Sequence, residues 1–257
     1  KGSVLIPKLL NEGYFVTVLD TMWFGNHFKN NKNLKIIKFD IRDIEQFEIG
    51  EHDIIIHLAS VANDPCSDLN PKLTWEISAL STMLLAEKAS KSNVKQFIYA
   101  SSGSVYGVKK ENKVTEESEL NPISEYNKTK MVAEKVLESY SSKFLLQIVR
   151  PATVCGLSNR MRFDVSVNAL TISALENKVM RVDGGDQIRP NIHIDDITDV
   201  YTYLLKNKNI EGIYNAGFEN LSIMDIAKKI QQVTGAEIYI NKKTDPRSYR
   251  MNSDKLL

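Results

Sequence analysis

The chain has 257 residues, of which 42% are hydrophobic and 25% are charged, and its formal net charge is +1. This length allows one large α/β domain or one domain with an attached lobe. The balanced charge gives no reason to expect nucleic acid or a membrane surface as a partner. Two scattered cysteines suggest neither a disulfide framework nor a metal site. Since we find no signal peptide or membrane-spanning run, the expected location is the cytoplasm.

The first 150 residues alternate helical and strand patterns. The predicted elements are, in order, helix 1–11, strands 14–20, 34–39 and 53–58, helix 71–91, strand 94–101, helix 124–142 and strand 144–149. Such alternation is typical of βαβ units, whose right-handed crossovers build a parallel sheet covered on both faces. The sequence therefore predicts an α/β fold with a doubly wound parallel sheet.

After Pro151 the pattern loosens. The predicted elements are helix 164–178, strand 179–183, helix 195–206, strand 212–216, a helix that begins at a Ser222–Asp225 capping box, and strand 236–240. We expect a nucleotide-binding domain over 1–160 and a smaller C-terminal substrate-binding lobe over 161–257. Within the lobe, about 190–217 is expected to return to the sheet.

Acidic and small residues end several predicted strands, where a doubly wound sheet binds a dinucleotide. Asp20 is placed to bond a ribose 2′-hydroxyl, and its charge would repel the 2′-phosphate of NADP, which favours NAD; the alternative is a turn residue. Asp40 could contact the adenine amino group, although Asp is common in turns. The segment Leu58-Ala59-Ser60 contains small residues, which would let the backbone approach the pyrophosphate of the dinucleotide.

A Rossmann fold is expected to open with a strand and a glycine-rich turn, yet this chain begins on its first helix. Gly2 is a plausible third glycine of that turn, where a side chain would push helix and strand apart. We therefore expect the first strand and two glycines upstream of residue 1.

Two motifs suggest redox chemistry on a hydroxyl. The i, i+4 spacing of Tyr126 and Lys130 puts both side chains on one helix face. A neighbouring ammonium and a cationic nicotinamide favour the phenolate, which can take a proton from a sugar hydroxyl as hydride leaves the same carbon. The Ser-rich segment 101–107 follows a strand, where a hydroxyl can hold the substrate oxygen. Either motif alone is common, and their combination is what points to a site.

Seven motifs together carry a resemblance over essentially the whole chain. They are Leu19-Asp20, Asp40-Ile-Arg-Asp43, His57-Leu-Ala-Ser60, Ser101-Ser-Gly-Ser-Val-Tyr-Gly107, Tyr126-x-x-x-Lys130, Val149-Arg-Pro151 and Arg189-Pro-Asn-Ile-His-Ile-Asp-Asp196. With this set the sequence resembles the extended short-chain dehydrogenase/reductase family, in its NAD-dependent nucleotide-sugar epimerase/dehydratase branch.

The resemblance implies a role for each matching residue. Ser102 would orient the substrate, Tyr126 would act as base, and Lys130 would hold the nicotinamide ribose. The implied contacts to NAD are Asp20 with the adenosine ribose, Asp40 and Ile41 with adenine, and Pro151 with the nicotinamide. The implied substrate-binding residues are Ser102, Ser104, Thr153, Arg189 as a clamp on the diphosphate, and Arg247 as a phosphate ligand. The implied partner is a nucleotide-diphosphate sugar, and helices 71–91 and 124–142 would form a homodimer contact.

Departures from the family pattern concern the substrate side. The family's 4,6-dehydratases carry Asp-Glu directly after the orienting hydroxyl, where this chain has Gly103-Ser104. Two positions at which the family pattern usually has Asn are occupied by Ser78 and Thr153 in this chain. A position at which the family commonly has Tyr is occupied by Cys155. These changes leave three hypotheses: a sugar C4 epimerase, a 4-ketosugar reductase or dehydrogenase, and a non-catalytic NAD-sensing regulator. Because Ser102, Tyr126 and Lys130 are intact, the third is disfavoured.

Four further residues have two interpretations each. Cys155 is expected to be a buried thiol rather than a catalytic group. Asp64 is equally compatible with substrate contact and helix capping. A core position is favoured for His193 over a catalytic one, and Trp75 is expected in a core or at a helix–helix contact.

Overall fold

The computed structural model describes residues 1–109, 113–242 and 248–257. Parallel strands form its centre in two blocks. The first block pairs β1 (Val16–Asp20) with β2 (Leu34–Lys38), and the second has β3 (Ile54–His57), β4 (Gln96–Ala100), β5 (Leu145–Pro151) and β9 (Gly212–Ala216) in that order. The prediction of a doubly wound parallel sheet is confirmed.

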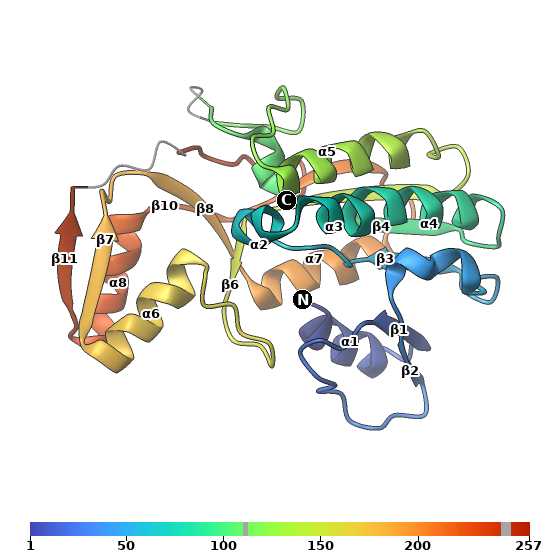
Figure 1. Ribbon diagram of the computed structural model, residues 1–257, viewed down its shortest axis with the longest axis horizontal. Helices are drawn as coiled ribbons and strands as arrows, with labels where there is room; N and C mark the ends of the chain where they lie inside the picture. Colours follow the sequence, from blue (N-terminus) through green and yellow to red (C-terminus); the bar gives the residue numbers. More distant parts are fainter. Residues whose placement is uncertain (110–112, 243–247) are drawn as a thin grey trace.

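Helices cover both faces of these strands (Figure 1). Helices α1 (Gly2–Asn11) and α7 (Ile194–Lys206) lie on one face, and α4 (Ser81–Ser90) and α5 (Glu125–Glu138) on the other. All five residues of β4 are buried: Ile98 and Ala100 join the core under α1 and α7, while Phe97 and Tyr99 join the core under α4 and α5. Alternate side chains of one strand thus fill two cores.

The C-terminal part forms two smaller sheets. Strands β6 (Thr153–Cys155), β8 (Ile188–His193) and β10 (Glu219–Ser222) pair in the order β10-β8-β6, and β7 (Val179–Asp183) pairs with β11 (Glu237–Asn241). Helices α6 (Ser166–Asn177) and α8 (Ile223–Thr234) pack on β7, away from α4 and α5 in Figure 1. The Ser222–Asp225 capping box at the start of α8 is confirmed. Strand β9 pairs with β5, whereas β8 pairs with β6 and β10 instead. The expected domain boundary between residues 160 and 161 stays a prediction.

The structure differs from the sequence prediction around helix 71–91. This helix consists of α3 (Pro71–Trp75), a π-helical turn η2 (Glu76–Leu80) and α4, and a short α2 (Asp64–Leu69) precedes it. In the π-helical turn, Ser78 Oγ lies 2.9 Å from Ser60 Oγ at the end of β3. Turns of this kind are frequent at functional sites, and no periodicity argument reveals them. Among the described helices, none is both long and apolar enough to cross a bilayer.

Candidate active site

The Ser-rich segment follows β4 at the carboxyl end of the sheet. Ser102 caps the short 3-10 helix η3 (Gly103–Tyr106), and its Oγ accepts a hydrogen bond from Ser104 N at 3.2 Å. The hydroxyls of Ser102 and Ser104 are 2.7 Å apart. Strands β5 and β9 end beside this segment, at Pro151 and Ala216, which pair with each other. The loop 101–106, called the catalytic loop below, therefore lies where three parallel strands end.

Tyr126 reaches the catalytic loop from the first turn of α5. Ser124 caps that helix through Asn127 N, and the Tyr126 phenol lies close enough to Ser102 for that residue to lower its pKa. Burial raises the pKa of Tyr126, while Ser102 and the positive charge of Arg162 lower it. Among the cations, Arg162 is the one that lowers the pKa of this phenol here, and the expected effect of Lys130 stays a prediction.

Lys130 lies one helical turn further on and is 2% exposed. Its Nζ donates to Ala100 O at 2.8 Å and lies 4.8 Å from the centre of the Tyr99 ring. Burial lowers the pKa of Lys130 to about 7, the charge of Lys1 acts in the same direction, and Glu134 opposes both. Lys130 therefore fastens α5 to the end of β4 directly below the catalytic loop.

A buried charged network supports the loop from beneath, and the sequence analysis did not find it. The Glu134 carboxylate accepts bonds from Ser101 Oγ and from Arg150, whose Nη2 lies at 2.7 Å. Arg150 Nη1 also donates to Tyr106 Oη at 2.9 Å, and Tyr106 donates to Asn215 Oδ1 at 2.7 Å. One signal was available: Glu134 is four residues after Lys130 on α5, and thus on the same face.

The expected adenosine contacts lie at strand ends. Asp20 ends β1 with an exposed side chain, and its Oδ1 accepts a bond from Met22 N at 2.7 Å. Asp40 caps a 3-10 helix (Ile41–Gln46) and is paired with Arg42, which holds the pKa of that carboxyl below its usual range. Both carboxylates therefore make the local hydrogen bonds that are typical of turn residues. Ile41, which follows Asp40 in the sequence, is half-buried.

Gly2 lies at the start of α1, and its packing against an upstream strand stays a prediction. A Cβ at Gly2 would meet only Ile6 Cδ1, at an ordinary 3.8 Å, so no strand crowds this position in the described residues. The half-buried Leu58, Ala59 and Ser60 follow β3 as expected. Together with Asp20 at the end of β1 and Tyr126 beside the end of β4, they form a set of polar groups and small residues that fits a dinucleotide along the strand ends.

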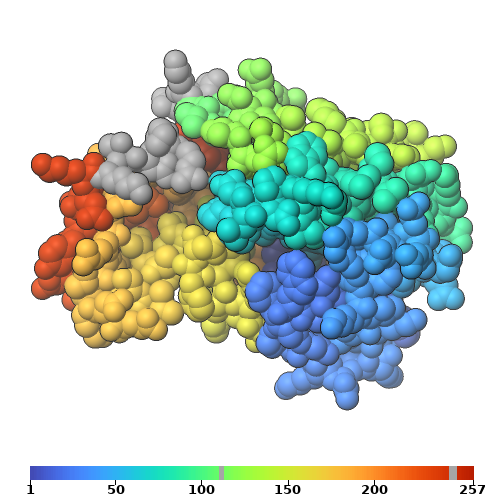
Figure 2. Space-filling view, viewed as in Figure 1, coloured from blue at the N-terminus to red at the C-terminus, as the bar shows by residue number. Residues whose placement is uncertain are grey.

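The residues predicted to bind substrate lie in the C-terminal part. Thr153 begins β6, and half-buried Arg189 lies on β8, opposite Leu221 of β10. Arg247 lies outside the described residues. Figure 2 shows a recess between the yellow segment after β6 and the blue and teal segments of the parallel-strand region. A hydrogen bond from Asn63 Nδ2 to Asp164 joins the two sides.

Two residues missed by the sequence analysis also lie at the catalytic loop. If Gly103 carried a Cβ, that atom would collide with Met251 Cε and would lie 3.1 Å from Tyr249 Oη. Burial raises the pKa of Tyr249, and the charge of Arg189 opposes this effect. The C-terminal segment therefore lines the site between Ser102 and Arg189.

The structure also assigns places to the residues with two interpretations. Burial raises the pKa of Cys155, which fits the expected structural thiol. The core position favoured for His193 is wrong, because its exposed ring caps α7 by accepting from Asp195 N at 3.3 Å. Asp64 accepts a 2.5 Å bond from Ser124 Oγ and raises the pKa of Tyr126, whereas Asn63 caps the helix.

Comparison with known proteins adds independent information. The model of the "NAD dependent epimerase/dehydratase family" matches residues 1–217. A putative UDP-glucose 4-epimerase of Methanocaldococcus jannaschii is 28% identical, covering 98% of this chain and 86% of that protein. Human dTDP-D-glucose 4,6-dehydratase is 29% identical, covering 99% of this chain and 80% of that protein. The structure of UDP-glucuronic acid 4-epimerase from Bacillus cereus with UDP-glucuronic acid and NAD is 27% identical, with a TM-score of 0.82 over 99% of this chain and 88% of that one.

Proposed function

The chain belongs to the NAD dependent epimerase/dehydratase family, and from that premise we propose that it is a nucleotide-sugar 4-epimerase. At the coarser level it is an NAD-dependent enzyme of the nucleotide-sugar epimerase/dehydratase branch, as its motifs indicated. The observation that carries the finer proposal is the position of Tyr126, whose phenol lies close enough to Ser102 for that residue to lower its pKa, beside the crowded Gly103. A UDP-hexose is the proposed substrate, since relatives of both sequence and structure are UDP-sugar enzymes by name.

The proposed chemistry needs one hydroxyl positioned and one proton moved. Ser102 holds the sugar O4 by a hydrogen bond, and Tyr126 takes the proton from that oxygen. Bound NAD would take up hydride from C4 and return it to the opposite face of the rotated sugar. Since burial keeps the phenol protonated in this structure, Tyr126 must lose its proton when the cationic cofactor and the substrate are present.

The space around Gly103 argues against water elimination at this site. A carboxylate or amide side chain there would overlap Met251, and the position also lies 3.2 Å from Pro151 O. The neighbouring Ser104 hydroxyl is a weak acid that is already bonded to Ser102. We therefore propose that hydride transfer at C4 proceeds without loss of the C6 hydroxyl.

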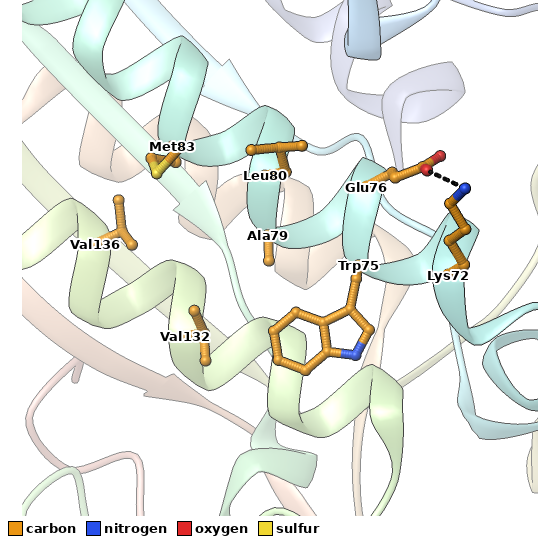
Figure 3. Close-up of a pocket in the computed structure, with 8 residues that line it drawn as sticks. All are labelled: Lys72, Trp75, Glu76, Ala79, Leu80, Met83, Val132 and Val136. Atoms are coloured by element: carbon orange, nitrogen blue, oxygen red, sulfur yellow. Dashed lines mark ion pairs between the residues drawn. The ribbon is translucent and has the colours of Figure 1, made fainter.

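We also propose a homodimer through the helical face of Figure 3. The residues lining this shallow groove are Lys72, Trp75, Glu76, Ala79, Leu80, Met83, Val132 and Val136. Leu80 is 47% exposed, and Trp75 is fixed across the groove by a 2.7 Å bond from Nε1 to Glu125. An apolar face shared by two parallel helices suits a two-fold contact with a second copy. Leu80→Glu should give a monomer in sedimentation, and Leu175→Glu on α6 is the matched control.

The reaction type is tested by incubating the purified protein with UDP-glucose and no added cofactor, and following the sugars by NMR. An epimerase carrying its own NAD forms UDP-galactose. A reductase needs added reduced cofactor and a 4-keto sugar, and a dehydratase forms a 4-keto-6-deoxy sugar. Either of the latter results would replace the proposal.

A further inference from the structure

The loop after β6 extends from the C-terminal part toward the parallel strands. Its residues 157–164, here called the crossing segment, run toward the blue part of the chain in Figure 1. Asn168 of α6 fixes the base of this loop, because its side chain accepts a bond from Gly156 N at 3.0 Å and donates one to Arg162 O at 2.8 Å. The crossing segment is thus anchored in the C-terminal part.

Two contacts join the crossing segment to loops that follow parallel strands. The guanidinium carbon of Arg160 lies 4.1 Å from the centre of the Phe24 ring, in the loop that begins after Asp20 at the end of β1. Asn63, in the loop after β3, donates a side-chain hydrogen bond to Asp164. The contacts therefore follow the two strands whose ends are expected to bind the adenosine ribose and the pyrophosphate of NAD.

Between these contacts the crossing segment carries a positive charge. Arg162 is half-buried, and its Nε donates to Asp164 Oδ1 at 3.0 Å. Burial lowers the pKa of Lys1 at the start of α1, and the charge of Arg162 acts in the same direction. At Tyr126, at the start of α5, burial raises the pKa and the same charge opposes it. A pyrophosphate at the start of α1 would therefore be attracted by this guanidinium as well as by the helix.

We propose that the crossing segment is a clasp over bound NAD, and that the contact between Arg160 and Phe24 must open each time the cofactor enters or leaves. Arg160 is exposed and Phe24 is 59% exposed, so the contact is weak enough to break while the strands stay folded. Slow exchange would keep one NAD bound through both hydride transfers of an epimerisation. The inference itself requires only that the chain binds NAD, so it does not depend on the sugar substrate.

The test follows the binding kinetics of NADH by its fluorescence, with no sugar present. Arg160→Gln and Phe24→Leu should each raise both the association rate and the dissociation rate roughly two- to fivefold, the range of one exposed cation–π contact, and leave the affinity nearly unchanged. The double variant should be no faster than the single ones, because all three lack the same contact. Arg181→Gln on β7 and Phe15→Leu before β1 are the matched controls, since both side chains are exposed.

The same measurements separate a clasp from a direct phosphate ligand. If Arg160 bound a phosphate of NADH, Arg160→Gln would raise the dissociation rate alone and weaken the affinity, while Phe24→Leu would change neither rate. That pattern would overturn the clasp, as would rates in both variants that equal those of the controls. Effects that multiply in the double variant would show that the two residues act separately, which also contradicts the proposal. A failure to epimerise UDP-glucose would leave these rates unaffected.

Discussion

The region beneath the catalytic loop and the C-terminal lobe are stabilised in different ways. Beneath the loop, Glu134 is fully buried and Arg150 is 2% exposed, and their charges meet with Ser101 and Tyr106. The core of the lobe, by contrast, consists of apolar residues. These include Ala174, Met180, Val182, Ile226 and Ala227.

This difference has consequences for tolerance to change. A buried charge needs every partner, because removing one leaves the other desolvated and uncompensated. An apolar core needs only volume and shape, and it accepts similar side chains at small cost. The region that positions the catalytic groups is therefore expected to be the fragile one, while the lobe can vary.

The largest expected effect is on stability beneath the loop. Glu134→Gln removes the charge that pairs with Arg150 and should lower the free energy of unfolding by about 3–5 kcal/mol. Met180→Leu in the lobe core should cost less than about 1.5 kcal/mol. Urea denaturation of both variants measures the contrast. Equal losses would remove the distinction between the two regions.

The next effect concerns the crowded position in the loop. Gly103→Asp forces a side chain against Met251 and should cost about 1–3 kcal/mol of stability, as overpacking does. We expect no 4-keto-6-deoxy product from this variant, and the double variant with Met251→Ala should recover part of the stability. Appearance of that product would show that Met251 does not exclude an acid at this position.

A smaller effect is expected at the far end of the cofactor site. NAD should bind more tightly than NADP, because the exposed Asp20 carboxylate repels a 2′-phosphate. Asp20→Ala should narrow that preference by roughly fivefold, since two charges about 4 Å apart in water interact by about 1 kcal/mol. Calorimetric titration with both cofactors gives the ratio, and an unchanged ratio would assign Asp20 to its turn alone.

The last effect is a dependence of stability on pH. Burial lowers the pKa of Lys130 to about 7, from an ordinary value of 10.5. Between these values the unfolded chain binds more protons, so this residue makes the free energy of unfolding rise with pH from about 7 toward 10. Lys130→Met should flatten that rise, whereas Lys135→Met, on an exposed part of the same helix, should not. Urea midpoints at pH 7, 8 and 9 test this difference.

The local parts of the fold were predictable because they depend on neighbours in sequence. Apolar runs revealed β4 and β5, and a capping box revealed the start of α8. The pairing of Tyr126 with the Ser-rich loop followed from one helix face and one strand end. These are patterns of period and spacing that need no tertiary information.

The remaining features depend on contacts between distant segments. Strands β6 and β10 have three and four residues, and each pairs with β8 from a distant part of the chain. Tyr249 reaches Gly103 only because Met251 fits between two glycines, and no local pattern marks that fit. His193 was misplaced because a His in a strand-like run resembles a core residue, yet it begins α7 in solvent.

The central claim is that Tyr126 moves the proton at the sugar hydroxyl, and Tyr126→Phe tests it most directly. The variant and the wild type are compared for bound NAD, for UDP-glucose affinity and for the rate of UDP-galactose formation. We predict a rate lowered by about 10²–10⁴-fold, with NAD content and affinity nearly unchanged, because only the proton-transfer group is lost. A variant that turns over at a near wild-type rate would contradict the claim.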